Sequence, residues 1–332
     1  MIGVRVLDLS RLLPGPFATL CLQGLGATVI KVEDPVGGDY LRAVPPYLGG
    51  HGAWFTALNR GKRSVALNLR DPTHRAALLA LLGDADVLVE SFRPGVLTRL
   101  GLDPRDLQAQ FPALVIASLT GWGQTGPWAR LPGHDIGYMA LAGMFADTVP
   151  LVPRMQWADV AAGGLVAALR IVDAVRERDR TGQGTWLDIA MLDGLVGLQQ
   201  TQFARFAAGA PPDPLLTGGL DTYRFYACQD GLVAVGALEP QFAAQLAPAD
   251  AASLTTRFAA MTRAEAAEVY ADACVVPVLG LDEVVAHPQV VARALFEDGL
   301  PHAPTGPVSG PPPDLGAHTE VELARVGVSL TG

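Results

Sequence analysis

Two ionisable side chains stand where a loop is expected to turn into a helix, namely His134 and Asp159, and the second is followed by Gly163 and Gly164. A helix N-terminus disfavours an imidazolium and favours a carboxylate, so His134 could act as a base near neutral pH. Free backbone N–H groups near Asp159 could hold a negatively charged oxygen, and the two glycines would let a ligand or a helix come close. The simpler alternative makes Asp135 and Asp159 ordinary N-caps and His134 a turn residue.

Cationic side chains gather at two further places. The segment 59–63 packs three cations into four positions before an expected strand, and Arg93 follows the end of another strand. Ligands of parallel sheets lie beyond the carboxyl ends of the strands, and guanidinium groups bind phosphate oxygens bidentately. A solvated surface cluster is the alternative. The candidate phosphate-binding residues are Asn59, Arg60, Lys62, Arg63, Glu90 and Arg93.

Several cofactor classes are disfavoured. Gly24 and Gly26 resemble part of a dinucleotide fingerprint, but Val29 occupies the third glycine position and the glycines precede a strand instead of following one. Lys31 and Lys62 are the only lysines, and neither has a convincing setting for a Schiff base. The cysteines are too far apart for a redox or zinc motif. We therefore expect no metal and no redox or pyridoxal cofactor. The cysteines are Cys21, Cys228 and Cys274.

Composition indicates the compartment and excludes some partners. The net charge of −9 argues against binding to nucleic acid. Hydrophobic residues make up 50% of the chain, yet no apolar run reaches the roughly 18 to 20 residues of a membrane span. The amino terminus enters a strand-like run without a secretion signal. We expect a cytoplasmic protein that binds neither nucleic acid nor a membrane.

The pattern of the first half predicts βαβ units around a mainly parallel sheet. Short β-branched runs alternate with longer amphipathic segments, and Asp71-Pro72 and Asp103-Pro104 are typical helix starts. A long amphipathic helix is expected from Asp159 to about Arg178. The predicted strands are 4–9, 28–33, 64–69, 86–90 and 114–119, and the predicted helices are 15–24, 72–82 and 104–110.

The second half predicts a smaller α+β lobe after a linker that contains Pro211 to Pro214. Strands are expected at 222–226 and 232–235, followed by helices between 240 and 273. A Pro/Gly-rich tract, 301–316, then leads to a last helix around 318–326, which suggests a return to the first lobe. The predicted division is 1–185 for the large lobe, 186–215 for a linker helix and loop, 216–300 for the small lobe and 301–332 for the return.

Motifs along nearly the whole chain resemble the superfamily of family III CoA-transferases and α-methylacyl-CoA racemases. The matching stretches are 6–16, 26–33, 59–64, 90–95, 121–127, 236–242 and 272–278. This resemblance implies a large doubly wound lobe and a small lobe in an interlocked homodimer. It also implies an acyl-CoA thioester substrate, with no cofactor beyond the coenzyme A that the substrate carries.

Three residues match functional positions of the superfamily. Racemases place a His and an Asp on opposite faces of the substrate α-carbon, and His134 and Asp159 match these positions. Glu239 matches a small-lobe glutamate that reaches the site from the partner chain. Transferases share the aspartate as a covalent nucleophile but usually have an aromatic residue in place of His134. The resemblance therefore favours a racemase of 2-methylacyl-CoA.

The expected chemistry is a 1,1-proton transfer through an enolate, with backbone N–H groups near Asp159 holding the enolate oxygen. CoA transfer between carboxylic acids through an aspartyl acyl-enzyme is the first alternative, and an acyl-CoA-binding protein without catalysis is the second. The segment between His134 and Asp159 is shorter than in racemases, which predicts a reduced loop around the acyl group.

Overall fold

The chain forms two compact units in a computed structural model that describes residues 1–146, 152–211 and 215–330. The large lobe comprises Met1–Gln200 and Glu297–Gly332, and the small lobe comprises Thr201–Phe296. The chain thus returns to the large lobe after the small one. Residues 186–200, which the sequence assigned to a linker, belong to the large lobe, because 186–190 form a strand of its sheet. Pro212 to Pro214 of the expected linker lie outside the described residues.

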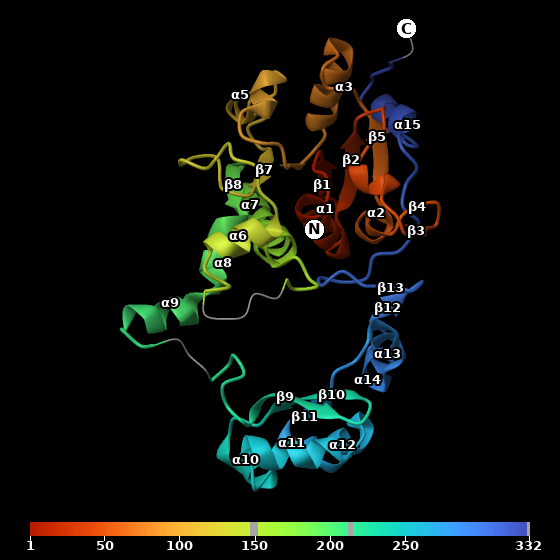
Figure 1. Ribbon diagram of the computed structural model, residues 1–332. Helices are drawn as coiled ribbons and strands as arrows, with labels where there is room; N and C mark the ends of the chain where they lie inside the picture. Colours follow the sequence, from red (N-terminus) through yellow and green to blue (C-terminus); the bar gives the residue numbers. More distant parts are fainter. Residues whose placement is uncertain (147–151, 212–214, 331–332) are drawn as a thin grey trace. The chain divides into compact units, whose positions relative to one another are not determined.

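A six-stranded parallel sheet with the order β5-β2-β1-β6-β7-β8 forms the centre of the large lobe (Figure 1). All five predicted strands are present. The sixth, β8, was missed because it runs into helix α8 without a turn residue between them. The strands are β1 Arg5–Asp8, β2 Thr28–Glu33, β5 Arg63–Ala66, β6 Val87–Glu90, β7 Val115–Thr120 and β8 Trp186–Ala190.

Helices cover both faces of this sheet, which confirms the expected α/β architecture of the large lobe (Figure 1). On one face, α1 and α7 bury Ala18 and Ile171 against Val6 and its neighbours. On the other face, α3, α5 and α15 bury Leu78 and Leu107 in a second core. Burial of these apolar side chains is the main force that holds the layers together. The helices are α1 Pro14–Gly24, α3 Pro72–Leu82, α5 Pro104–Gln110, α7 Val166–Thr181 and α15 Thr319–Arg325.

The long helix expected from Asp159 to Arg178 begins differently. Residues Trp157–Leu165 form a π-helix, and only then does the chain continue as α7. Gly163 and Gly164 lie where α1 packs against this π-helix, and a Cβ on Gly164 would come within 2.8 Å of Phe17 Cδ1. The glycines therefore allow the close approach of a helix that the sequence predicted. π-Helical turns are rare and frequently occur at functional sites.

Shorter elements complete the large lobe around the ends of the strands. A 3₁₀ turn, Tyr40–Ala43, and the strand pair β3 and β4 follow β2, and a two-stranded sheet of β12 and β13 precedes the C-terminal segment. These elements are β3 Tyr47–Leu48, β4 His51–Gly52, α2 Ala53–Asn59, α4 Val96–Arg99, α6 Asp135–Leu141, α8 Met191–Leu198, β12 Phe296–Glu297 and β13 Leu300–Pro301.

The small lobe contains a three-stranded antiparallel sheet of order β11-β10-β9. The predicted strand, turn and strand are present in it as β9 and β10. Tyr226 and Val233 of this sheet pack with Phe258 in the core of the lobe. Among the described residues, no helix combines the length and apolarity needed to cross a bilayer. The elements are α9 Gln200–Ala207, β9 Tyr223–Cys228, β10 Gly231–Gly236, α10 Pro240–Gln245, α11 Ala251–Ala259, α12 Arg263–Val269, a 3₁₀ turn Ala271–Ala273, β11 Val275–Pro277, α13 Leu281–Ala286 and α14 Pro288–Ala292.

Candidate active site

A pocket with a volume of about 250 Å³ lies at the carboxyl ends of β1, β6 and β7 in the large lobe. Arg11 and Arg93 line it from the loops after β1 and β6, and Thr120 lines it from the end of β7. The opposite wall comes from the segment around α6 and from the start of the π-helix. Open parallel sheets bind their ligands at this edge, so the pocket lies where the topology favours a ligand.

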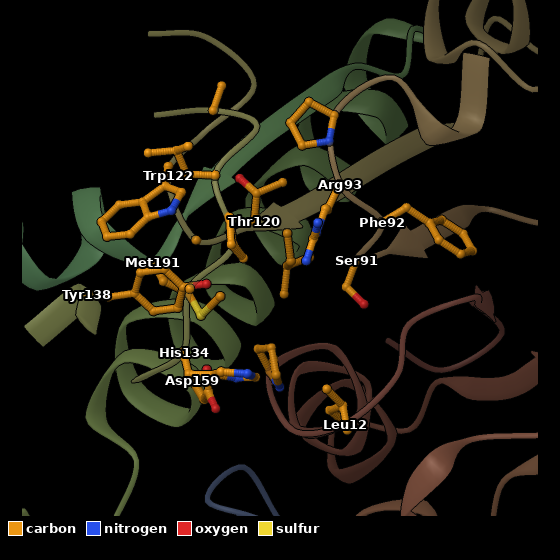
Figure 2. Close-up of a pocket in the computed structure, with 18 of the residues that line it drawn as sticks. Leu12, Ser91, Phe92, Arg93, Thr120, Trp122, His134, Tyr138, Asp159 and Met191 are labelled. Carbon is orange, nitrogen blue, oxygen red and sulfur yellow. The ribbon is translucent and has the colours of Figure 1, made fainter. Parts of the chain in front are cut away.

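The structure brings His134 and Asp159 into this one pocket. His134 is the N-cap residue of α6; its side chain makes no capping bond and is exposed. Asp159 lies in the first turn of the π-helix and is partly buried. Figure 2 shows both side chains at the same end of the pocket, below Tyr138 and Met191. The pocket therefore combines an accessible imidazole with a carboxyl group.

Asp135 links the two segments that carry these groups. Its Oδ1 accepts hydrogen bonds from the backbone N–H of Ala158 at 2.7 Å and of Asp159 at 3.1 Å. Val160 N–H donates to Gln156 O at 2.9 Å. The N–H groups around Asp159 thus have internal partners, and the expectation that they would hold an enolate oxygen is wrong. Asp135 is not the N-cap residue of its own helix α6, because His134 holds that position. Its side chain bonds the first-turn N–H groups of the π-helix instead.

The carboxyl group of Asp159 is tuned to exchange a proton near neutral pH. Burial, and then the negative charge of Asp135, raise the pKa of Asp159 to about 7. Both effects disfavour the charged form of a carboxyl group. Burial and the charge of Asp159 likewise raise the pKa of the neighbouring Tyr138 to about 12, so its hydroxyl stays protonated. Asp159 can therefore serve as an acid in one step and as a base in another.

An aromatic wall, which the sequence did not assign to the site, bounds the pocket. The ring of Tyr138 packs edge-on against Trp122, with 4.6 Å between centroids. A Cβ on Gly121 or Gly133 would lie only 2.2 or 2.6 Å from Cε1 of this ring. The two glycines are therefore required for the position of Tyr138. A Gly-Trp pair at the end of a strand, with a Tyr four residues after His134, is the signal that could have pointed to this wall.

The candidate phosphate ligands around residue 60 do not line this pocket. Lys62 is fully buried, and its Nζ lies 3.2 Å from Asp8 Oδ2 and 2.7 Å from Thr19 Oγ1. The same Nζ lies 3.0 Å from Asn59 Oδ1, and Asn59 is also fully buried. A buried ammonium with these partners balances the charge of Asp8. The structure therefore gives Lys62 and Asn59 a role in the core instead of in phosphate binding.

Two other cations of the same segment hold the C-terminal return. Arg60 is buried and donates to the backbone oxygens of Val308 at 3.0 Å and Pro301 at 2.5 Å. Arg63 pairs with Glu322, which lies in α15. Both guanidinium groups are thus engaged by segments far away in the sequence. The expectation that they bind phosphate is not supported, because these internal acceptors already occupy them.

Glu90 and Arg93, the remaining candidates, have opposite surroundings. Glu90 is buried and accepts from Phe92 N–H at 2.7 Å, and burial raises its pKa to about 7. It supports the loop rather than facing an anion. Arg93 is exposed, lines the pocket and has no carboxylate partner among the described residues. Arg93 is therefore the one member of the predicted set that is free to meet a phosphate there.

A neighbouring pocket of about 230 Å³ shares Arg11 and Phe92 with the first. Its wall contains the apolar side chains Leu67 and Val32 together with Asn68 and Arg70, which follow β5. Neither Arg11 nor Arg70 pairs with a carboxylate in the part of the chain that the structure describes. Neither arginine was predicted as a ligand from the sequence, although each follows the end of a strand, as Arg93 does.

The sequence profile of CoA-transferase family III matches residues 1–250, which include the whole candidate site. The chain belongs to CoA-transferase family III. Human α-methylacyl-CoA racemase is 35% identical in an alignment 370 residues long, gaps included, which covers 98% of this chain and 93% of the racemase. Mouse succinyl-CoA:glutarate CoA-transferase is 36% identical over 244 residues that cover 71% of this chain and 56% of the transferase.

The fold agrees with this family assignment. The crystal structure of a CaiB/BaiF family protein from Brucella suis matches with a TM-score of 0.85 and 28% identity, and the match covers 98% of each chain.

In this family III chain, Glu239 lies in the small lobe, where it is the exposed N-cap residue of α10 and its side chain makes no capping bond. Its carboxylate therefore has no role in holding α10.

Proposed function

We propose that this family III chain racemises 2-methylacyl-CoA thioesters by moving one proton through an enolate. The observation that carries the proposal is the pair His134 and Asp159 in one pocket, with the pKa of Asp159 raised to about 7 by burial and by Asp135. A racemase needs two groups that each give and take a proton near neutral pH. The match to human α-methylacyl-CoA racemase over 98% of the chain supports the same assignment.

In the proposed mechanism the thioester makes the α-proton acidic, because sulfur donates little electron density to the carbonyl group. His134 removes this proton from the S substrate, and the C–H electron pair becomes the enolate. Protonated Asp159 then delivers its proton to the opposite face of the α-carbon, which gives the R product. The R substrate reacts in reverse, with Asp159 as the base and the imidazolium of His134 as the acid. Each turnover leaves the two groups in exchanged protonation states, which solvent restores.

The coenzyme A part of the substrate is proposed to follow the carboxyl edge of the sheet. Arg93 in the first pocket, and Arg11 and Arg70 toward the second, present guanidinium groups without carboxylate partners among the described residues. Such groups bind phosphate oxygens bidentately. The second pocket mixes apolar side chains such as Leu67 and Val32 with polar ones such as Asn68, a combination that would suit the face and the edge of a nucleotide base, while the first pocket would hold the thioester. Arg93, Arg11 and Arg70 thus replace residues 59–63 as the proposed phosphate ligands.

The second candidate function is CoA transfer, which the similarity to succinyl-CoA:glutarate CoA-transferase favours. In that reaction the Asp159 carboxylate would attack the thioester carbonyl, release CoA thiolate and form an acyl-enzyme anhydride. The exposed imidazole of His134 in the pocket has no role in this scheme, which is why we prefer racemisation. Hydroxylamine trapping during turnover distinguishes the two, since only a transferase would convert Asp159 into a hydroxamate.

The decisive test follows deuterium and configuration together. Wild-type enzyme in deuterated water should convert either pure enantiomer to a mixture of both and place deuterium at the α-carbon. Asp159→Asn should still exchange the S substrate through His134, but without inversion, and should be inert toward the R substrate. His134→Asn should still exchange the R substrate through Asp159 without inversion, and should be inert toward the S substrate. Inversion should fall by about 10²- to 10⁴-fold in each variant.

Asp173→Asn, on the exposed surface of α7, is the matched control and should behave as wild type. If wild-type enzyme leaves both enantiomers without deuterium while it moves CoA to a free acid, the racemase proposal is wrong and the transferase is correct. If it binds acyl-CoA and does neither, the chain is a binding protein.

We extend the proposal to a homodimer in which Glu239 of the partner subunit completes each active site, as the family resemblance implies. The exposed carboxylate of Glu239, which caps no helix, supports a role outside its own lobe. A carboxylate near His134 would favour the imidazolium that forms when the S substrate loses its proton.

A further inference from the structure

Asp135 connects the two helices that carry the proposed acid–base pair. It is the first residue of α6, directly after His134, and it bonds the N–H groups of Ala158 and Asp159 through one oxygen. These bonds span 23 and 24 positions of the sequence, so they form a tertiary link. One carboxylate therefore fixes the backbone of Asp159 against the backbone that carries His134.

From this geometry we infer that Asp135 is a positioning residue that sets both the place and the charge state in which Asp159 works. The inference rests on the proposed function, since it concerns the same pair. Two physical effects act together. The N–H groups that bond Asp135 are withheld from the Asp159 side chain, which loses donors that would stabilise its carboxylate. The negative charge of Asp135 also repels a second negative charge nearby.

The other groups around Asp159 do not supply this effect. Its pKa is raised by burial and by Asp135. Tyr138 on α6 is neutral near pH 7, and the other side chains with ionisable groups that line the pocket are His134, Arg11 and Arg93. Elements packed on the π-helix carry further titratable side chains that do not line the pocket. They are Cys21 of α1, Asp188 of β8, Asp193 of α8, and Arg170, Asp173, Arg176, Glu177, Arg178, Asp179 and Arg180 of α7.

Two substitutions separate position from charge. Asp135→Asn keeps an oxygen that can accept from Ala158 and Asp159 but removes the charge, whereas Asp135→Ala removes both. Asp71→Asn is the matched control, because Asp71 also accepts from two N–H groups at a helix start, those of Thr73 and His74 at 2.7 and 3.3 Å. It caps α3, and its carboxylate does not line the pocket.

The expected signature is in the pH profiles of both directions. Asp159 must be protonated to convert S to R and ionised to convert R to S. The rate of S-to-R conversion should therefore fall as pH rises through the pKa of Asp159, and the rate of R-to-S conversion should rise. In the wild-type enzyme both limbs should have their midpoint near pH 7. In Asp135→Asn both limbs should move to lower pH by on the order of one unit, because the repelling charge is gone. The maximal rate should fall less than in Asp135→Ala, because the oxygen that bonds the N–H groups of Ala158 and Asp159 is kept.

Asp135→Ala should shift both limbs at least as far, because the N–H groups of Ala158 and Asp159 are also freed to bond the Asp159 carboxylate. It should in addition lower kcat by about 10²-fold, since the two segments are no longer held together. Asp71→Asn should leave both limbs in place. A ¹³C NMR titration of the Asp159 carboxyl group, assigned with Asp159→Asn, measures the same pKa without turnover. Far-ultraviolet circular dichroism confirms that each variant is folded.

The inference is overturned if the Asp159 midpoint in Asp135→Asn equals that of wild type, or if Asp135→Ala keeps full kcat. Failure of the proposed function looks different. In that case the wild-type enzyme would exchange no deuterium, while the NMR titration would still report whether Asp135 shifts Asp159.

Discussion

Lys62 and Arg93 have opposite surroundings, since Lys62 is buried beside Asp8 and Arg93 is exposed in the first pocket. Lys62→Met would remove the ion-pair partner of the fully buried carboxylate of Asp8 and leave only the more distant charge of Lys31 nearby. Removing one partner of a buried ion pair costs about 3–5 kcal/mol, so we expect a loss of this size in the free energy of unfolding by denaturant titration. Lys62 lines neither of the two pockets described above, so the folded fraction should keep the wild-type KM for acyl-CoA.

Arg93→Met should give the opposite result. The charge-assisted bonds of one guanidinium to a phosphate contribute about 1.5–3 kcal/mol, which predicts a rise of about 10- to 100-fold in KM and little change in stability. Arg99→Met, on α4 and outside the first pocket, is the matched control. An unchanged KM in Arg93→Met would argue against the proposed path of coenzyme A.

Local rules placed Arg93 beyond the end of a strand and His134 and Asp159 at helix starts, but only the family resemblance assigned the latter two to one site. All three line the same pocket. It could not assign Arg60 and Arg63, because the groups that occupy them lie more than 200 positions away, at Val308 and Glu322. The aromatic wall was missed for a related reason. In the sequence Tyr138 is indistinguishable from an ordinary core residue, because its contact with Gly121 exists only in the folded chain.

At the scale of elements, the π-helix depends on its contact with α1. A methyl group on Gly164 would meet Phe17 Cδ1 at 2.8 Å and the backbone oxygen of Pro14 at 3.0 Å. Overpacking of this kind typically costs about 1–3 kcal/mol, and a shift of the π-helix would also move Asp159. We expect Gly164→Ala to lower both the free energy of unfolding and kcat.

Gly197→Ala is the matched control for that substitution. Gly197 also lies in a helix, α8, but a Cβ there would meet no atom within 4 Å. Replacing glycine by alanine in an unstrained helix stabilises it by about 0.4–1 kcal/mol. A Gly164→Ala enzyme with wild-type stability and kcat would show that α1 does not determine the position of the π-helix.

The elements of the fold were more predictable than the site. Alternating patterns and Asp-Pro starts located the parallel strands, α3 and α5, because each pattern is contained in its own segment. The π-helix could not be predicted, since residues 157–165 have the apolar composition of an α-helix start. Its different geometry accompanies packing against α1 and the bonds from Asp135, which are both contacts at long sequence separation.

At the scale of the whole molecule, the chain leaves the large lobe at residue 200 and returns at residue 297. Its C-terminal helix is held by Glu322, a buried carboxylate that pairs with Arg5 at 2.9 Å and also with Arg63. Both ends of the small lobe are thus connected to the same large lobe. In the proposed homodimer, Glu239 of the partner subunit would complete the active site of each large lobe.

Mixed dimers test whether Glu239 acts across such an interface. Asp159→Asn and Glu239→Gln chains with different affinity tags would be co-expressed, and the heterodimer would be isolated through both tags. If Glu239 of the partner subunit completes the site, one of the two sites carries both defects and the other carries none. The heterodimer should then have about half of the wild-type kcat per dimer, which would be far above either variant alone. If Glu239 serves its own chain, each site has one defect and the heterodimer should be as slow as the variants.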